Sequence, residues 1–152
     1  MPTLDPQGEY LARVWKEAVY PLAERLGIRM RLPPVQPRSR LAHEAAKWAR
    51  TQDHFDEYNA AIFRAFFEGG EDIGSEEVLA RLAVDLNLDA VSLRGSLKAR
   101  EFEASVLADE DEAEALGVRG VPAFVADRRA ALSGVQSMPA LQALIDQVKI
   151  VK

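Results

Sequence analysis

The sequence of 152 residues contains no cysteine. This absence excludes disulfide bonds, a catalytic thiolate and a cysteine-ligated metal within these residues. Basic residues are also in the minority, because 19 Lys and Arg are set against 24 Asp and Glu, for a net charge of −5. That balance argues against a nucleic-acid-binding protein, which usually presents a basic surface.

Long hydrophobic runs and the marks of a targeting segment are missing too. No run is long and apolar enough to span a bilayer. The N-terminal stretch MPTLDPQGEY has neither the basic start nor the apolar core of a secretory signal. We therefore expect a cytoplasmic protein with no membrane partner. Hydrophobic residues, at 48%, and charged residues, at 28%, are in the proportions of a single globular domain that buries a core.

Most of the chain has the periodicity of amphipathic helices. Pro21 predicts a kink or a break in the first of them, and the alternation of apolar residues with arginine over residues 28–32 favours a short strand. Ser75 and Asp89 are placed as helix N-caps. The expected helices cover residues 10–26, 39–50, 53–70, 75–88, 90–99 and 101–117.

The pattern changes at Gly117. The stretch VPAFVAD, residues 121–127, is short, apolar and strand-like, and AALSG, residues 130–134, can return antiparallel to it through the turn DRR. An amphipathic helix, MPALQALIDQVKIV, then ends the chain. The order predicts a helical subdomain over residues 9–116 and a strand–strand–helix subdomain over residues 117–152.

The stretch GVRGVPAFVADRRAALSGVQSMPALQALI resembles the C-terminal half of the DsbA-like thioredoxin family, in particular its FrnE-like branch. Upstream segments such as RSRLAHEAAKWARTQ and FDEYNAAIFRAFFEGGEDIGSEEVLARLA extend the resemblance to about residues 28–148. Kappa-class glutathione transferases and 2-hydroxychromene-2-carboxylate isomerases are related to this family. The resemblance implies an α/β, thioredoxin-like fold of the DsbA type, dominated by a large inserted helical domain.

The resemblance also implies a set of substrate-binding residues. Pro122 corresponds to the family's cis-proline, and Val121 precedes it, with backbone groups that meet an extended substrate or glutathione. Ser133, Gly134 and Gln136 match a segment that opens the last helix, whose free N–H groups suit a carboxylate. Read without the family, Pro122 would be an ordinary proline at the start of a strand.

The chain departs from the family at its start. The first strand, the C-x-x-C helix and the second strand have no counterpart, so no residue is predicted to be catalytic and disulfide exchange by these residues alone is excluded. The chain is either a truncated form of a longer oxidoreductase or isomerase, or a degenerate form that keeps the binding half. Two alternatives stay open: a glutathione-dependent isomerase or transferase, and a non-catalytic peptide-binding or chaperone-like module.

The missing segment predicts an uncovered strand. In a thioredoxin sheet the strand after the cis-proline is central, so residues 121–127 would here expose an apolar edge. We expect a second copy of the chain, another polypeptide or residues 28–32 to cover it. The expected partners are otherwise a peptide or thiol substrate and, in the alternative reading, glutathione; no cofactor is predicted.

Other candidate groups support weaker hypotheses. His43 and His54 lack the spacing of a metal site, so no metal is predicted. The acidic run at residues 109–114 lacks the glycine of a calcium loop and reads as a solvated helix face. Arg38 and Ser39 occupy positions where glutathione-handling relatives often carry Asn-Thr. The altered residues weaken the glutathione interpretation, and Arg38 is interpreted as a solvent-exposed residue at the helix entry. Phe66 and Phe67 point about 100° apart on a helix, so that one of them can line an apolar groove.

Overall fold

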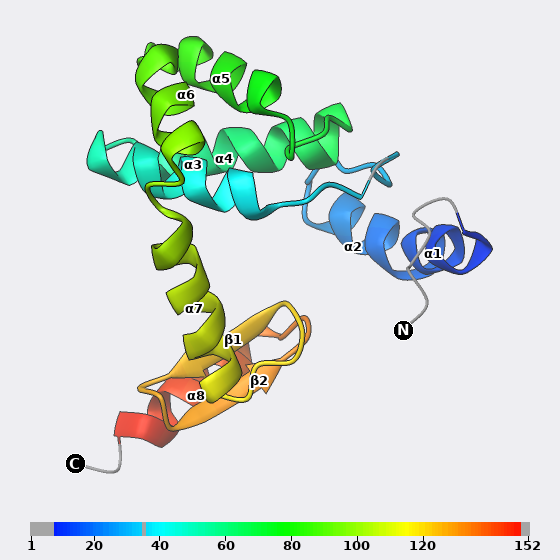
Figure 1. Ribbon diagram of the computed structural model, residues 1–152. Helices are drawn as coiled ribbons and strands as arrows, with labels where there is room; N and C mark the ends of the chain where they lie inside the picture. Colours follow the sequence, from blue (N-terminus) through cyan, green and yellow to red (C-terminus); the bar gives the residue numbers. More distant parts are fainter. Residues whose placement is uncertain (1–7, 35, 150–152) are drawn as a thin grey trace. The chain divides into compact units, whose positions relative to one another are not determined.

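The computed structural model describes residues 8–34 and 36–149 and is dominated by helices (Figure 1). By their internal contacts the residues form two compact units, divided after Val106. The helical unit holds α1 (Glu9–Val14), a π-helical turn (Trp15–Val19), α2 (Tyr20–Arg25), α3 (Arg40–Thr51), α4 (Phe55–Arg64), a second π-helical turn (Ala65–Gly69), α5 (Glu76–Asp85) and α6 (Ala90–Ala99). The division falls inside α7 (Glu103–Ala115), upstream of Gly117.

The first helical segment shows how Pro21 is accommodated. The expected kink or break is replaced by a π-helical turn between α1 and α2, in which the Tyr20 N–H donates to the carbonyl oxygen of Trp15. Proline has no N–H to give to the residue four positions earlier, and a π turn is a common way to absorb that loss. Gly27, with φ +66°, ends the segment, and the Ile28 N–H donates to the Ala23 carbonyl at 2.8 Å.

The strand expected at residues 28–32 is not formed; this prediction was wrong. The segment is irregular, and its Arg31 N–H donates to the carbonyl of Phe67, within the second π-helical turn, at 2.8 Å. Pro33 and Pro34 follow immediately and cannot donate to a strand ladder. Residues 28–32 are therefore no cover for a sheet edge.

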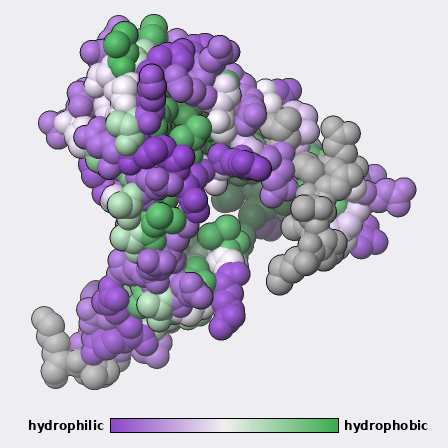
Figure 2. Space-filling model, viewed as in Figure 1, coloured by the Kyte–Doolittle hydropathy of each residue, from purple (hydrophilic) through white to green (hydrophobic). Residues whose placement is uncertain are grey.

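The core of the helical unit lies between α3, α4, α5 and α6. Alanines on α3 and α4 let these helices approach closely, and larger side chains fill the remaining space. Tyr58, which is 0% exposed, donates its hydroxyl to the Leu79 carbonyl at 2.7 Å and so ties α4 to α5. On the face seen in Figure 2 this unit is mostly hydrophilic, as expected for helices whose apolar sides face a core.

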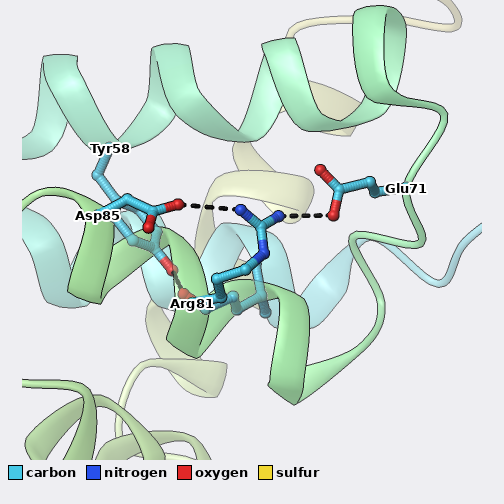
Figure 3. A network of polar contacts seen from close by, with 5 residues as sticks. Tyr58, Glu71, Arg81 and Asp85 are labelled. Carbon is cyan, nitrogen blue, oxygen red and sulfur yellow. Dashed lines mark hydrogen bonds and ion pairs between the residues drawn. The ribbon is translucent and has the colours of Figure 1, made fainter.

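An ion-pair network on the surface of the same unit links α5 to the segment before it. Arg81 donates to Asp85 at 2.9 Å and to Glu71 at 2.5 Å, so that one guanidinium spans two carboxylates (Figure 3). Arg81 and Asp85 are solvent-exposed and Glu71 is partly exposed, so this network contributes little to stability.

The two predicted N-caps differ in the structure. Asp89 accepts hydrogen bonds from the backbone N–H groups of Val91 and Ser92 and caps α6. Ser75 occupies the N-cap position of α5 with extended backbone angles but makes no side-chain capping bond. Only the aspartate therefore satisfies the free N–H groups of the helix it begins.

The second unit contains a β-hairpin and the last helix. Strand β1 (Ala123–Ala126) pairs antiparallel with β2 (Ala130–Ser133), and α8 (Met138–Lys149) packs on both strands. Asp127 and Arg128 in the turn have positive φ, the sign that both central residues of a type I′ hairpin turn require. The hairpin and final helix agree with the order that the sequence predicts.

Candidate substrate-binding site at the end of the hairpin

The open end of the hairpin brings together the residues that the family resemblance pointed to. Ala123 faces Ser133 in the last pair of the ladder. One step beyond it, the Gly134 N–H donates to the Pro122 carbonyl at 2.8 Å. Residues 121–122 and 133–134, which are eleven or more positions apart in the sequence, are thus held side by side.

The Val121–Pro122 peptide bond is cis. Val121 is 91% exposed, although it is a large apolar residue beside a paired strand. The Pro122 carbonyl accepts a hydrogen bond from the Gly134 N–H. This bond holds the backbone directly after Val121 in place at the end of the hairpin. The valine is therefore presented to solvent by a backbone that is itself held in place.

Gly134 and Gln136 shape the connection from β2 to α8. Gly134 has φ +82°, a conformation that glycine adopts at little cost. The Gln136 side chain donates from Nε2 to the Ser133 carbonyl at 2.7 Å. Gln136 thus closes this turn, and a ligand would have to displace that bond to use its amide.

The start of α8 offers fewer free N–H groups than the sequence suggested. Pro139 has none, the Ala140 N–H donates to Ser137 Oγ at 3.3 Å, and the Leu141 N–H donates to the Ser137 carbonyl at 3.1 Å. A carboxylate at this helix end would compete with the Ser137 cap.

Two further apolar side chains border the site. Val135 and Met138, which follow Gly134 in the sequence, are exposed, and we refer to them together with Val121 as the hairpin-end patch. The sequence analysis did not single out Val135 or Met138. The sequence pattern that could have identified them is the presence of these two large apolar residues beside glycine, glutamine and serine in residues 134–138.

Strand β1 has one paired side. Within residues 8–34 and 36–149, its only sheet neighbour is β2. The outer edge of β1 therefore carries backbone groups with no strand beside them, as the sequence predicted for residues 121–127.

A second candidate region lies in the helical unit. Two adjoining hollows, of about 590 and 210 Å³, share Asn59, Phe63 and Phe67 in their walls. Phe63 and Phe67 stack with centroids 6.0 Å apart, and Phe66 meets Phe67 edge to face at 4.8 Å. Ser39 and His43 line the smaller hollow; Arg38 lies beside it, with its backbone against Gly74.

The other candidate residues named from the sequence make contacts within the fold. His54 Nδ1 lies 2.6 Å from the Gln52 carbonyl. In the acidic run, Glu112 pairs with Arg128 of the hairpin turn. Among the residues described, no three His, Asp or Glu side chains are grouped as a metal would require, and no helix is long and apolar enough to cross a membrane.

Comparison with known proteins identifies the fold. The DSBA-like thioredoxin domain family matches residues 7–146. A probable DsbA oxidoreductase from Streptomyces coelicolor, known from its crystal structure, is similar with a TM-score of 0.80 at 25% identity, over 96% of this chain and 64% of its own. The uncharacterized protein YwbO of Bacillus subtilis is 31% identical over 127 residues, which are 82% of this chain and 62% of YwbO. The chain belongs to the DSBA-like thioredoxin domain family.

Family membership confirms the fold class. The chain has a DsbA-like thioredoxin fold in which helices dominate and the sheet is small. It spans less than two thirds of the length of both relatives. No cysteine stands where the family's C-x-x-C would be sought, because the sequence has none.

Proposed function

We propose that residues 121–136 form the substrate-binding half of a DsbA-type thiol–disulfide oxidoreductase, and that they hold an extended peptide segment or a small thiol beside Pro122. The single observation that carries this proposal is the gathering of Val121, Pro122, Ser133 and Gly134 at one end of the hairpin, with Val121 almost fully exposed.

The chemistry of such a site is recognition by the backbone. Val121 is 91% exposed, and we propose that its backbone N–H and C=O pair with an added extended segment. The hairpin-end patch gives the side chains of that segment apolar contacts, and methionine adapts to varied shapes. Binding of this kind tolerates many sequences, which suits an enzyme that acts on many protein substrates.

The proposal assigns binding, and no bond-making step, to this chain. Thiol–disulfide exchange requires a thiolate that attacks a disulfide sulfur, and the 152 residues contain no cysteine. The sulfur groups would come from a longer form of the protein or from a partner. In a degenerate form without either, the same residues would act as a non-catalytic peptide-binding or chaperone-like module.

A glutathione-dependent isomerase or transferase is the alternative. Glutathione carries two carboxylates, which require nearby donors. The N–H groups of Ala140 and Leu141 already donate to Ser137, and Pro139 has no N–H. This arrangement favours a peptide over glutathione as the ligand of the site.

Amide chemical shifts of the labelled chain test the proposal. The ligands are a short extended peptide with a central S-methylcysteine, the same peptide with alanine at the centre, and oxidised and reduced glutathione in separate titrations. We expect the S-methylcysteine peptide to shift signals of residues 121–136. Shifts there with glutathione only would support the alternative, equal affinity for both peptides would support a non-catalytic module, and no shifts there would overturn the proposal.

A matched pair of variants adds a control. Val121→Asp places a charge where we expect the peptide to lie, and it should weaken binding about tenfold or more, since an apolar contact worth about 1.5 kcal/mol is lost. Val91→Asp makes the same change on α6, at a valine that is 80% exposed. Equal loss of affinity in both variants would contradict the assignment.

We also propose that a strand from a second copy, or from a partner chain, covers the outer edge of β1. The support is the one-sided pairing of β1 among the described residues and the exposure of Val125. Sedimentation over a range of concentrations should show self-association, and amides of residues 121–127 should exchange slowly. A monomer at all concentrations whose amides there exchange rapidly would refute it.

A further inference from the structure

One carboxylate is buried in the helical unit. Glu44 of α3 is 1% exposed, and both of its carboxylate oxygens lack a hydrogen-bond partner. It is the only acidic or basic residue in the buried core of the described chain. Burying a charge in this way is costly unless another charge compensates it.

The compensating charge is Arg100. Its Nε lies 3.5 Å from Glu44 Oε1. Arg100 is the C-cap of α6 and has φ +54°, which is uncommon for a residue with a side chain. The same guanidinium also pairs with Glu103 in the first turn of α7. One arginine thus joins a buried and an exposed carboxylate across the α6–α7 junction, residues 100–103.

Few other charges act on Glu44. Arg40 lies one turn earlier on α3, and its charge favours the ionised carboxylate, as does that of Arg100, whereas Glu103 opposes it. Helices α4, α5 and α6 all pack against α3, but among the described residues the only charge that they contribute to this balance is that of Arg100, the C-cap of α6. Tyr58 of α4 is neutral, and its hydroxyl is bonded to Leu79.

Burial dominates this balance. Desolvation raises the pKa of Glu44 above the usual range of a glutamate, more than the Arg100 charge lowers it. Glu44 therefore takes up a proton at a pH at which ordinary exposed carboxylates are still ionised.

We propose that Glu44 is a proton-operated latch on the α6–α7 junction. While Glu44 is ionised, it shares Arg100 with Glu103, and the guanidinium holds the junction against α3. When Glu44 is protonated, Arg100 pairs with Glu103 alone, and residues 100–103 open more often. The junction leads directly into α7, the helix within which the chain passes from the helical unit to the unit that carries the hairpin.

The latch predicts two opposite responses to acid. Because the pKa of Glu44 is higher in the folded state than in the unfolded state, the folded state binds the proton more tightly. The contribution of Glu44 to stability is therefore largest at low pH and falls as pH rises through the folded-state pKa. Protonation should thus stabilise the helical unit as a whole while it loosens the junction. A carboxylate with a purely structural role would not separate these two effects.

Hydrogen exchange of the full chain tests the latch. Glu44→Gln imitates the protonated side chain at every pH, and comparison with the natural chain at matched pH cancels the intrinsic pH dependence of exchange. At neutral pH we expect the amides of residues 100–103 to exchange several-fold faster in Glu44→Gln, with equal or higher resistance of the unit to denaturant. At mildly acidic pH the two chains should become alike.

Two controls keep the result interpretable. Glu76→Gln removes the carboxylate of the exposed Arg94–Glu76 pair, 2.7 Å apart, and should change neither measurement. If Glu44→Gln does not fold, carboxyl-carbon NMR of the natural chain replaces it, since the Glu44 titration should coincide with faster exchange at residues 100–103. Equal junction exchange in the natural and Glu44→Gln chains at neutral pH, or a Glu44 titration without a change there, overturns the proposal.

Discussion

Removing the buried hydroxyl of Tyr58, in Tyr58→Phe, should destabilise the helical unit by about 1–2 kcal/mol. The hydroxyl is fully buried and donates to the Leu79 carbonyl at 2.7 Å. Phenylalanine keeps the ring and its edge-to-face contact with Trp48, 6.3 Å between centroids. The loss therefore isolates one hydrogen bond and the buried carbonyl oxygen that it leaves unsatisfied.

Thermal unfolding followed by circular dichroism measures this loss. For a unit of about 100 residues, 1 kcal/mol lowers Tm by roughly 4–8 °C. Tyr20→Phe is the matched control. The Tyr20 hydroxyl is also bonded to the backbone, although as an acceptor from the Leu32 N–H at 3.0 Å, and its residue is 39% exposed. Water can replace that bond, so the control should lose less than about 0.5 kcal/mol.

Alkaline pH gives a second test of the same hydroxyl. Burial raises the pKa of Tyr58 far above the ordinary range of a tyrosine. The unfolded chain therefore releases this proton at a lower pH than the folded chain, and stability falls as pH rises past about 10. Tyr58→Phe should lose stability less steeply over that range. Equal melting temperatures of the two phenylalanine variants, or identical alkaline slopes with and without the hydroxyl, would refute the reasoning.

Three other changes have definite expected outcomes. Asp89→Ala removes two capping bonds of α6 and should cost about 1 kcal/mol in denaturant unfolding, whereas Ser75→Ala, at a cap with no such bond, should cost only a few tenths. Leu144→Ala removes the buried residue of α8 and should cost about 2–5 kcal/mol, seen as early loss of the hairpin amides in hydrogen exchange. Gly74→Ala would place a Cβ 3.1 Å from the backbone oxygen of Arg38 and should lower Tm.

The helices were predictable because their signals are local. Asp89 begins a helix, and Gly117, where the pattern changes, ends one with positive φ, as the sequence indicated. Ser75 shows the limit of such signals, since the same N-cap position is occupied without the bond. Whether a side chain makes its capping bond depends on a rotamer that spacing does not determine.

The wrong strand at residues 28–32 has a physical reason as well. Alternating apolar and basic residues satisfy the period of a strand, but a strand needs a partner ladder. The backbone N–H of Arg31 instead donates to the carbonyl of Phe67, within a π-helical turn. The alternation of apolar and basic residues does not show which backbone segment will lie beside them in the fold.

The buried Glu44 was not predicted, although a signal was present. It lies three residues after Leu41 and four before Trp48, so it falls on the apolar face of α3 that these residues define. A charged residue at such a position requires a partner. The partner, Arg100, is 56 positions away and depends on a left-handed backbone conformation, so no pattern within α3 could have named it.

The proximity of the candidate site residues was more predictable, because these residues are close together in the sequence. They lie within one hairpin and the following turn, so a family resemblance over a single short stretch includes all of them. The sequence could not show which of their hydrogen-bonding groups are free to bind a ligand. The Gln136 side chain donates to the Ser133 carbonyl, and Ser137 Oγ accepts from the Ala140 N–H. Val121, in contrast, is left open. In the proposed site, substitutions at Val121 and Ser137 should therefore distinguish a peptide ligand from a carboxylate ligand. A substitution at Pro122 should not, because we propose that either ligand lies beside it.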